Sequence, residues 1–301
     1  MELSVTQENF ARALAIVGRI ASSRAGLPIL GNVLLRTEAN RLLVAATNLE
    51  IAATCYVGAK ITKPGELTLP AKLISEFMAS LPRGTVDIVS KGTSMTISSG
   101  NYSSIMSGVD AGEFPELPSI DENQAVTYTI AVADFKQAVS QTIITTSNDT
   151  SRPVLTGVYW HTDGGKLYLA GTDGYRLAQR RLFDTTSEIA AIVPTSSLQE
   201  VLRTISDGTD QVEVLFDDEQ VRFRVDDSEI TSRLIEGSYP KYQQLIPATS
   251  ETQARVKMDD FSRIVKIAGL FARNSGGSVT VTVDGEKNNI SIHSIASELG
   301  E

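Results

Sequence analysis

The chain repeats one segment three times: Phe10-Ala11-Arg12-Ala13-Leu14, Phe135-Lys136-Gln137-Ala138-Val139 and Phe261-Ser262-Arg263-Ile264-Val265. The three phenylalanines stand 125 and 126 residues apart, and the segment 28–33 returns in the same register at 153–158. This period is that of a whole domain, because the repeats of solenoid proteins span only about 20–50 residues. The sequence therefore predicts one domain present two and a half times.

Each copy opens with a predicted helix. Apolar residues lie three and four positions after each phenylalanine, which is the spacing of one helix face. The residue immediately before each phenylalanine is of the type that caps helices, namely Asn9, Asp134 and Asp260. We therefore expect three equivalent amphipathic helices that begin at these caps.

Alternating apolar runs after the helix predict β-hairpins over 33–45 and 158–170. A second helix entered through Pro70 or Pro194 follows, and then a second hairpin, over 86–98 and 212–224. In the third copy we expect one helix and one hairpin, formed by 278–283 and 289–294, without the second half of the unit. Each copy is thus an α+β unit with two helices packed on antiparallel strands. The polar stretches at 121–123 and 248–251 predict domains at 1–121, 122–247 and 248–301, the last one incomplete.

Composition limits the classes of function. The chain has 301 residues, one cysteine, two histidines and a net charge of −9. These counts exclude a disulfide scaffold and argue against a clustered zinc site. The first residues resemble neither a signal peptide nor a membrane span, so we expect a protein of the reducing cytoplasm. The negative net charge argues against tight DNA binding, unless the basic residues gather on one surface.

Basic residues do gather on one predicted helix face. Arg12 and Arg19 lie nearly opposite the apolar stripe of the first helix, and Arg263 repeats the position of Arg12 in the third copy. Such a face suits weak phosphate contacts along a bore. It is also what an ordinary surface helix carries, so charge alone leaves both interpretations open.

Three further segments resemble one known family: Leu27-Pro28-Ile29-Leu30-Gly31-Asn32, Thr172-Asp173-Gly174-Tyr175-Arg176-Leu177-Ala178 and Ser232-Arg233-Leu234-Ile235-Glu236-Gly237-Ser238-Tyr239-Pro240-Lys241-Tyr242. They look like signatures of the bacterial sliding clamp, the beta subunit of DNA polymerase III, and the resemblance is collinear along the whole chain. It implies a DNA clamp fold, in which a head-to-tail homodimeric ring has helices lining a central hole and sheets outside. It also implies a processivity factor for bacterial DNA replication that does no catalysis, needs no cofactor or metal, and encircles double-stranded DNA.

The resemblance implies three sets of site residues. The predicted DNA-contacting residues are Arg12, Arg19, Arg24, Lys72, Arg83, Arg203 and Arg263. A groove for linear peptides of the replicative polymerase, the clamp loader and repair proteins would use Arg152, Leu155, Thr172, Gly174, Tyr175, Arg176, Leu177, Pro240, Gln244 and Leu245. The predicted dimer interface consists of Tyr102, Ile105, Leu270 and Phe271.

Ring closure in the family pairs an edge strand of the first domain, matched here by 102–107, with a strand of the third domain of the neighbouring chain. That partner strand would follow Glu301, the last residue of this sequence. We therefore expect this chain to close a ring poorly or not at all.

Two other functions remain open. The first is a hydrolase that uses Asp173 or the pair Asp217 and Asp218, although these acids are most simply placed in turns and no nucleophile, phosphate loop or metal spacing accompanies them. The second is a clamp fragment that binds partner peptides without encircling DNA. Retention on circular but not on linear DNA separates this second function from that of a ring.

Overall fold

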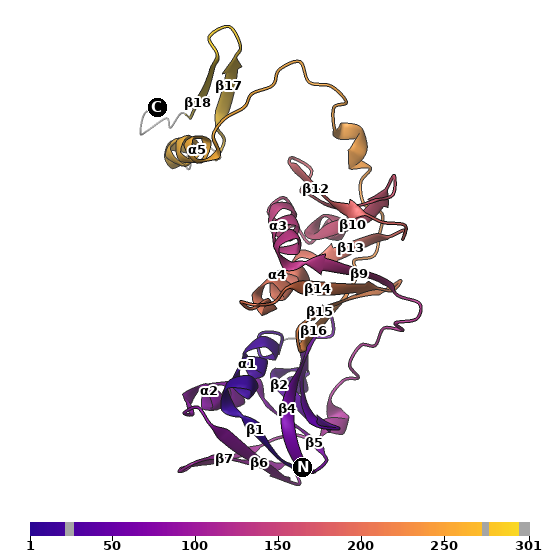
Figure 1. Ribbon diagram of the computed structural model, residues 1–301, viewed down its shortest axis with the longest axis vertical. Coiled ribbons are helices and arrows are strands. Elements are labelled where there is room, and N and C mark those ends of the chain that lie inside the picture. Colours follow the sequence, from indigo (N-terminus) through magenta and orange to yellow (C-terminus); the bar gives the residue numbers. More distant parts are fainter. Residues whose placement is uncertain (22–26, 273–276, 295–301) are drawn as a thin grey trace. The chain divides into compact units, whose positions relative to one another are not determined.

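The computed structural model describes residues 1–21, 27–272 and 277–294. The chain forms two compact units, Met1–Tyr239 and Pro240–Glu301 (Figure 1). None of the helices in these described ranges is long and apolar enough to cross a membrane.

The first repeat consists of eight strands and two helices with a 3-10 turn after the first helix. In chain order these are β1 (Glu2–Thr6), α1 (Gln7–Val17), η1 (Pro28–Gly31), β2 (Asn32–Glu38), β3 (Arg41–Thr47), β4 (Ile51–Lys63), β5 (Glu66–Pro70), α2 (Ala71–Ser80), β6 (Thr85–Lys91), β7 (Ser94–Ser99) and β8 (Tyr102–Ser107). A linker that contains η2 (Ala111–Glu113) leads to the second repeat.

The second repeat has the same elements in the same order. They are β9 (Val126–Ala131), α3 (Val132–Ile143), η3 (Pro153–Thr156), β10 (Gly157–Asp163), β11 (Lys166–Thr172), β12 (Leu177–Asp184), β13 (Ala190–Pro194), α4 (Thr195–Thr204), β14 (Gln211–Phe216), β15 (Gln220–Val225) and β16 (Ser228–Arg233). The second unit contains η4 (Tyr242–Leu245), α5 (Met258–Ala272), β17 (Thr280–Asp284) and β18 (Asn289–His293). The predicted α+β class and both pairs of hairpins are confirmed.

Antiparallel pairing joins the two repeats into one sheet. Its central path runs β8-β7-β6-β1-β4-β16-β15-β14-β9, and β2, β3 and β5 extend it from β4. The seam between the repeats is β4 against β16, where Ile51 pairs with Ser232 and Cys55 with Ser228. The strands β12-β11-β10-β13 form a separate sheet, and β17 pairs with β18.

The helices bury the face that the sequence pattern predicts. In α1 the residues Phe10, Ala13, Leu14 and Val17 are buried, and α3 buries four residues at the same spacing, starting at Phe135. Helix α1 packs beside α2 in the first repeat and α3 beside α4 in the second (Figure 1). Most buried apolar residues of the two repeats form one core that continues across the β4–β16 pairing, and Leu34, Leu43, Ala45, Ala111 and Phe114 form a smaller second cluster.

The predicted helix starts are wrong by three residues. Helices α1, α3 and α5 begin at Gln7, Val132 and Met258, so Asn9, Asp134 and Asp260 lie in the first turn and are not caps. A backbone carbonyl takes the place of the expected side chain: the Gln7 N–H donates to the Gly84 carbonyl (2.8 Å) and the Val132 N–H to the Asp210 carbonyl (2.9 Å). Since β1 and β9 lead directly into the helices, the neighbouring loop satisfies these N–H groups. In the third copy, β17 begins two residues later than expected.

Candidate functional site

A tight turn joins β11 to β12, and the segment 172–177 that contains it carries half of the predicted groove residues. The Thr172 hydroxyl donates to the Arg176 carbonyl (2.7 Å) and accepts from the Gly174 N–H (3.0 Å). The Asp173 carboxylate accepts from the N–H groups of Tyr175 (2.9 Å) and Arg176 (3.0 Å). Gly174 has φ +93°, a conformation that side chains rarely adopt. The turn is therefore held by its own side chains, and Tyr175 projects from it 96% exposed.

Charge adds to the rigidity of this turn. The Arg176 Nε lies 2.9 Å from the Asp173 Oδ2. The backbone N–H groups of Arg176 and Tyr175, together with this guanidinium, lower the pKa of Asp173 to about 2. Asp173 is thus a carboxylate throughout the physiological range. Its hydrogen bonds hold the turn, which is a structural use of a residue type that also serves catalysis.

A second arginine lies beside the turn. The Nη1 of Arg152 would be 3.6 Å from a Cβ atom placed at Gly174, and its Nε pairs with the Asp149 Oδ2 at 3.3 Å. Leu155 follows in η3 and is buried, with its N–H donating to the Arg152 carbonyl (3.0 Å). The structure therefore brings Arg152 together with the Thr172–Leu177 turn. A Cβ atom at Gly174 would make an ordinary van der Waals contact with this guanidinium, so the constraint on this position is its positive φ.

The other predicted groove residues belong to the second unit. Pro240, Gln244 and Leu245 are exposed, Leu245 at 76%, and the last two lie in η4. Their grouping with the Thr172–Leu177 turn stays a prediction. Two residues outside the predicted groove set, Asp149 and Asp173, pair with Arg152 and Arg176. The spacing of each acid three residues before its arginine is the signal that could have found them.

The predicted DNA-contacting residues that lie in the described ranges are exposed, and most of them have an acidic neighbour. The pairs are Arg19 with Glu200 (2.9 Å), Lys72 with Glu76 (4.0 Å), Arg83 with Glu8 (3.5 Å), Arg203 with Glu200 and Arg263 with Asp260 (3.8 Å). Arg12 donates to the Asn9 side chain at 3.0 Å. Arg24 lies outside the described residues. Paired cations of this kind make a shallow positive potential because each acid offsets part of the charge of its neighbour.

The predicted interface residues lie at an edge of the first unit and on a helix of the second. Tyr102 and Ile105 belong to β8, which ends the sheet path and pairs only with β7 in the described sheets. Ile105 is 72% exposed. In α5, Leu270 is exposed and Phe271 is half-buried. An edge strand with one unpaired side and exposed apolar side chains such as Tyr102 and Ile105 is a template for pairing with another chain.

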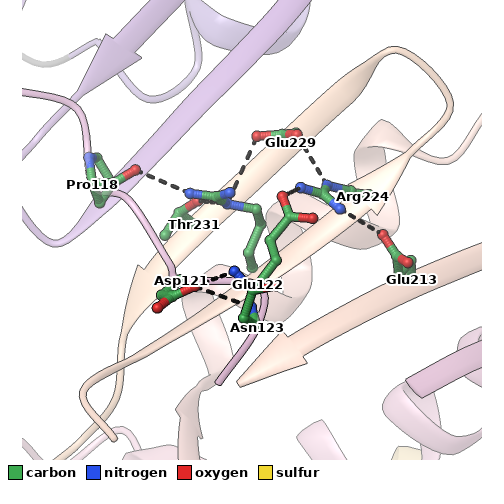
Figure 2. Close-up of polar contacts among 9 residues, drawn as sticks. Pro118, Asp121, Glu122, Asn123, Glu213, Arg224, Glu229 and Thr231 are labelled. Atoms are coloured by element: carbon green, nitrogen blue, oxygen red, sulfur yellow. Dashed lines mark hydrogen bonds and ion pairs between the residues drawn. The ribbon is translucent and has the colours of Figure 1, made fainter. Parts of the chain in front are cut away.

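The linker between the repeats is fastened to the second repeat. Arg224 of β15 pairs with three carboxylates, those of Glu122, Glu213 and Glu229, and Figure 2 shows these groups around the guanidinium. Arg222, on the same strand, donates from its Nη2 to the Pro118 carbonyl at 3.1 Å. The linker segment 118–122 therefore has a defined place against β15.

Comparison with known proteins identifies the class. Residues 1–118 match the N-terminal domain of the DNA polymerase III beta subunit, and residues 129–241 match its central domain. Together these matches cover more than half of the chain, which belongs to the DNA polymerase III beta subunit family. The resemblance seen in the sequence is thereby confirmed.

Individual relatives agree along the chain. The beta sliding clamp of Synechococcus elongatus is 29% identical over 311 residues, which is 100% of this chain and 82% of that protein. The clamp of Bacillus subtilis is 28% identical over 313 residues with the same coverage. A solved structure of the Bacillus subtilis DNA polymerase sliding clamp superposes with a TM-score of 0.91 at 27% identity, covering 100% of this chain and 82% of that one. The DNA clamp fold is therefore confirmed.

Proposed function

We propose that this chain is a sliding clamp that encircles duplex DNA and serves as a processivity factor for a bacterial replicative DNA polymerase. The observation that carries the proposal is the agreement with beta sliding clamps over the whole chain, in both sequence and fold. The clamp adds no catalytic group, since the polymerase and the loader perform the chemistry. In this role the protein would act in the cytoplasm as a head-to-tail homodimer. Its domains would span residues 1–121, 122–247 and 248–301.

The mechanism follows from the paired cations. Tight phosphate binding would act as friction, whereas topological closure retains a ring on DNA without strong affinity. The arginines and lysines that share their charge with neighbouring acids suit weak contacts of this kind. In the proposal, the bore is lined by the seven predicted DNA-contacting residues: Arg12, Arg19, Arg24, Lys72, Arg83, Arg203 and Arg263.

The partner site of the proposal is a groove that includes the Thr172–Leu177 turn. The turn is pre-organised by four hydrogen bonds, so a linear peptide would meet an ordered surface and less entropy would be lost on binding. A sliding clamp from Bartonella birtlesii, 26% identical to this chain, was crystallised with griselimycin bound. Polymerase, loader and repair-protein peptides are the partners that we propose for this groove.

Retention on DNA tests the ring. The protein is loaded on nicked circular DNA and passed over a sizing column before and after linearisation. Retention on the circle with release from the linear form supports encirclement, and equal loss from both contradicts it. The alternative is a peptide-binding module that does not encircle DNA. It predicts that the protein is lost equally from circular and linear DNA but still binds a polymerase-tail peptide. The agreement with sliding clamps along the whole chain favours the ring.

A further inference from the structure

The turn between β3 and β4 repeats the hydrogen bonds of the proposed partner site. The Thr47 hydroxyl donates to the Ile51 carbonyl (3.0 Å) and accepts from the Leu49 N–H (3.0 Å). The Asn48 side-chain oxygen accepts from the N–H groups of Glu50 (3.0 Å) and Ile51 (2.8 Å). These are the four bonds that hold the Thr172–Arg176 turn, with Asn48 in the place of Asp173. The domain repeat has therefore produced the same turn twice.

A cavity of about 510 Å³ lies beside this first turn. Its walls are the turn itself, the linker segment 116–119 and the end of β16 at Thr231, Ser232 and Arg233. The linker wall is fixed, because Arg222 donates to the Pro118 carbonyl and to the Thr231 hydroxyl (3.2 Å). The volume lies within the range of small-molecule pockets, about 300–1,000 Å³, and is large enough to take a few side chains of a peptide.

Leu49 indicates that this cavity has a binding role and is not only a by-product of the domain repeat. It has φ +76° where the second turn has Gly174, and it lines the cavity with half of its side chain exposed. A bulky residue in the left-handed region is strained, and such strain persists at binding and switch sites more than elsewhere. Glycine would relieve this strain, so the leucine side chain at the rim points to an apolar contact.

Charge distinguishes the two turns. Glu50 and Glu116 line the first cavity, and both are exposed without an ion pair in the described part of the chain. Arg233 is the one basic residue among the described lining residues, which leaves the lining net negative. At the second turn, by contrast, Arg152 and Arg176 are each paired with an aspartate. The first cavity is therefore complementary to a ligand with a positive charge next to an apolar group.

We propose that this cavity is a second peptide-binding site, which takes an extended segment with alternating apolar and basic side chains from a protein partner. Leu49 would contact the apolar side chain, and Glu50 and Glu116 the basic ones. The proposal rests on the proposed function only for the kind of ligand, a linear peptide. It requires neither DNA nor a closed ring.

Methyl NMR on the full chain, with labelled leucine and isoleucine, tests the site. The probes are two blocked hexapeptides, Gly-Leu-Lys-Leu-Lys-Gly and its charge-reversed counterpart Gly-Leu-Glu-Leu-Glu-Gly. We expect the lysine peptide to shift the methyl signals of Leu49, Ile51 and Leu117, and the glutamate peptide to bind at least about tenfold more weakly there. No shift at these methyls, or equal shifts with both peptides, overturns the proposal.

Matched variants assign the charge preference. Glu50→Gln with Glu116→Gln should weaken the lysine peptide by about threefold or more, as expected for two exposed ion pairs. Glu113→Gln, an exposed acid on the same linker outside the cavity lining, should leave affinity unchanged. Equal effects of the double variant and the control contradict the proposal. The Leu155 and Leu177 methyls report the other turn in the same spectra, so failure of a polymerase-tail peptide to bind there is seen separately as failure of the proposed function.

Discussion

The turns Thr47–Ile51 and Thr172–Arg176 have the same backbone scaffold but carry different chemistry. In both, the threonine hydroxyl donates one hydrogen bond and accepts another, and the Asn or Asp side-chain oxygen accepts two from backbone N–H groups. The third position is a strained leucine in one and a glycine in the other, and the last two positions are Glu-Ile in the first turn and Tyr-Arg in the second. The threonine and the Asn or Asp therefore fix the shape of the turn, and the residues at the other positions can differ without changing it.

Gly174→Val should break the second turn most severely. At φ +93° a β-branched residue is strained, and its side chain would stand in contact with the Arg152 guanidinium, whose Nη1 is 3.6 Å from the Cβ position. We expect a loss of about 1–3 kcal/mol in unfolding free energy and a loss of at least about tenfold in affinity for a polymerase-tail peptide. Urea unfolding and fluorescence anisotropy measure the two effects.

The control for that variant is Gly208→Val. Gly208 has a similar φ of +96° in the loop after α4, where no heavy atom crowds the position. It should lose similar stability but keep its peptide affinity. If both variants lose affinity equally, the effect belongs to global stability and not to the turn.

The next largest effect should come from removing the central acceptor of each turn. Asp173→Ala removes two backbone hydrogen bonds and the partner of Arg176, whereas Asn48→Ala removes two hydrogen bonds and no charge. We therefore expect Asp173→Ala to weaken the polymerase-tail peptide several-fold and Asn48→Ala to leave that affinity unchanged. Amide hydrogen exchange at Tyr175 and at Glu50 should each rise only in its own variant, and a rise at both sites in either variant would refute independent turns.

Leu49→Gly gives the first turn the residue type that the second turn has at this position, Gly174. It relieves the left-handed strain of a leucine, worth about 1–2 kcal/mol, but it loses apolar contact and adds unfolded-state entropy. We expect a net gain in stability of less than about 1 kcal/mol in urea unfolding, together with loss of the lysine-peptide shifts. A loss of stability above about 1 kcal/mol would show that Leu49 serves the fold rather than a ligand.

The smallest effect concerns pH. An unperturbed Asp has a pKa of 3.8, and the hydrogen bonds of the turn lower that of Asp173 to about 2. Because the folded pKa is depressed, its contribution to stability is complete above pH 3.8 and is lost as the pH falls toward 2. The amide signals of Tyr175 and Arg176 should therefore show no titration step near pH 3.8. Their titration step should lie near pH 2 and should be absent in Asp173→Asn, and the first turn, with Asn48, should show none; a step near pH 3.8 would contradict the prediction.

The repeat made much of the fold predictable. The spacing of Phe10, Phe135 and Phe261 predicted the equivalent helices, and alternation predicted the hairpins. The helix starts were wrong because backbone carbonyls of Gly84 and Asp210, distant in sequence, replace the side-chain caps. Strand β4 went unpredicted, since most of its residues from 51 to 57 are buried and show no alternation.

The site was predictable only in part. The segment 172–177 stood out because it resembles a family signature, and Asp-Gly indicated a turn. The pairing of Arg224 with Glu122 depends on folding, because these two residues are 102 positions apart and no local pattern tells that their charges meet. The cavity beside Leu49 was invisible for the same reason: its walls come from three segments that the seam brings together.

Because Cys55 lies in the pairing of β4 with β16, the reactivity of its thiol can report whether the two repeats unfold together. Its thiol lies 3.3 Å from the Ser228 hydroxyl, directly across the seam, and burial raises its pKa to about 11. At neutral pH the thiol is almost entirely protonated and therefore slow to react. Its labelling rate therefore measures how often β4 separates from β16 and exposes the thiol. If this rate equals the rate of global unfolding, the two repeats unfold cooperatively, and if it is faster they separate before they unfold.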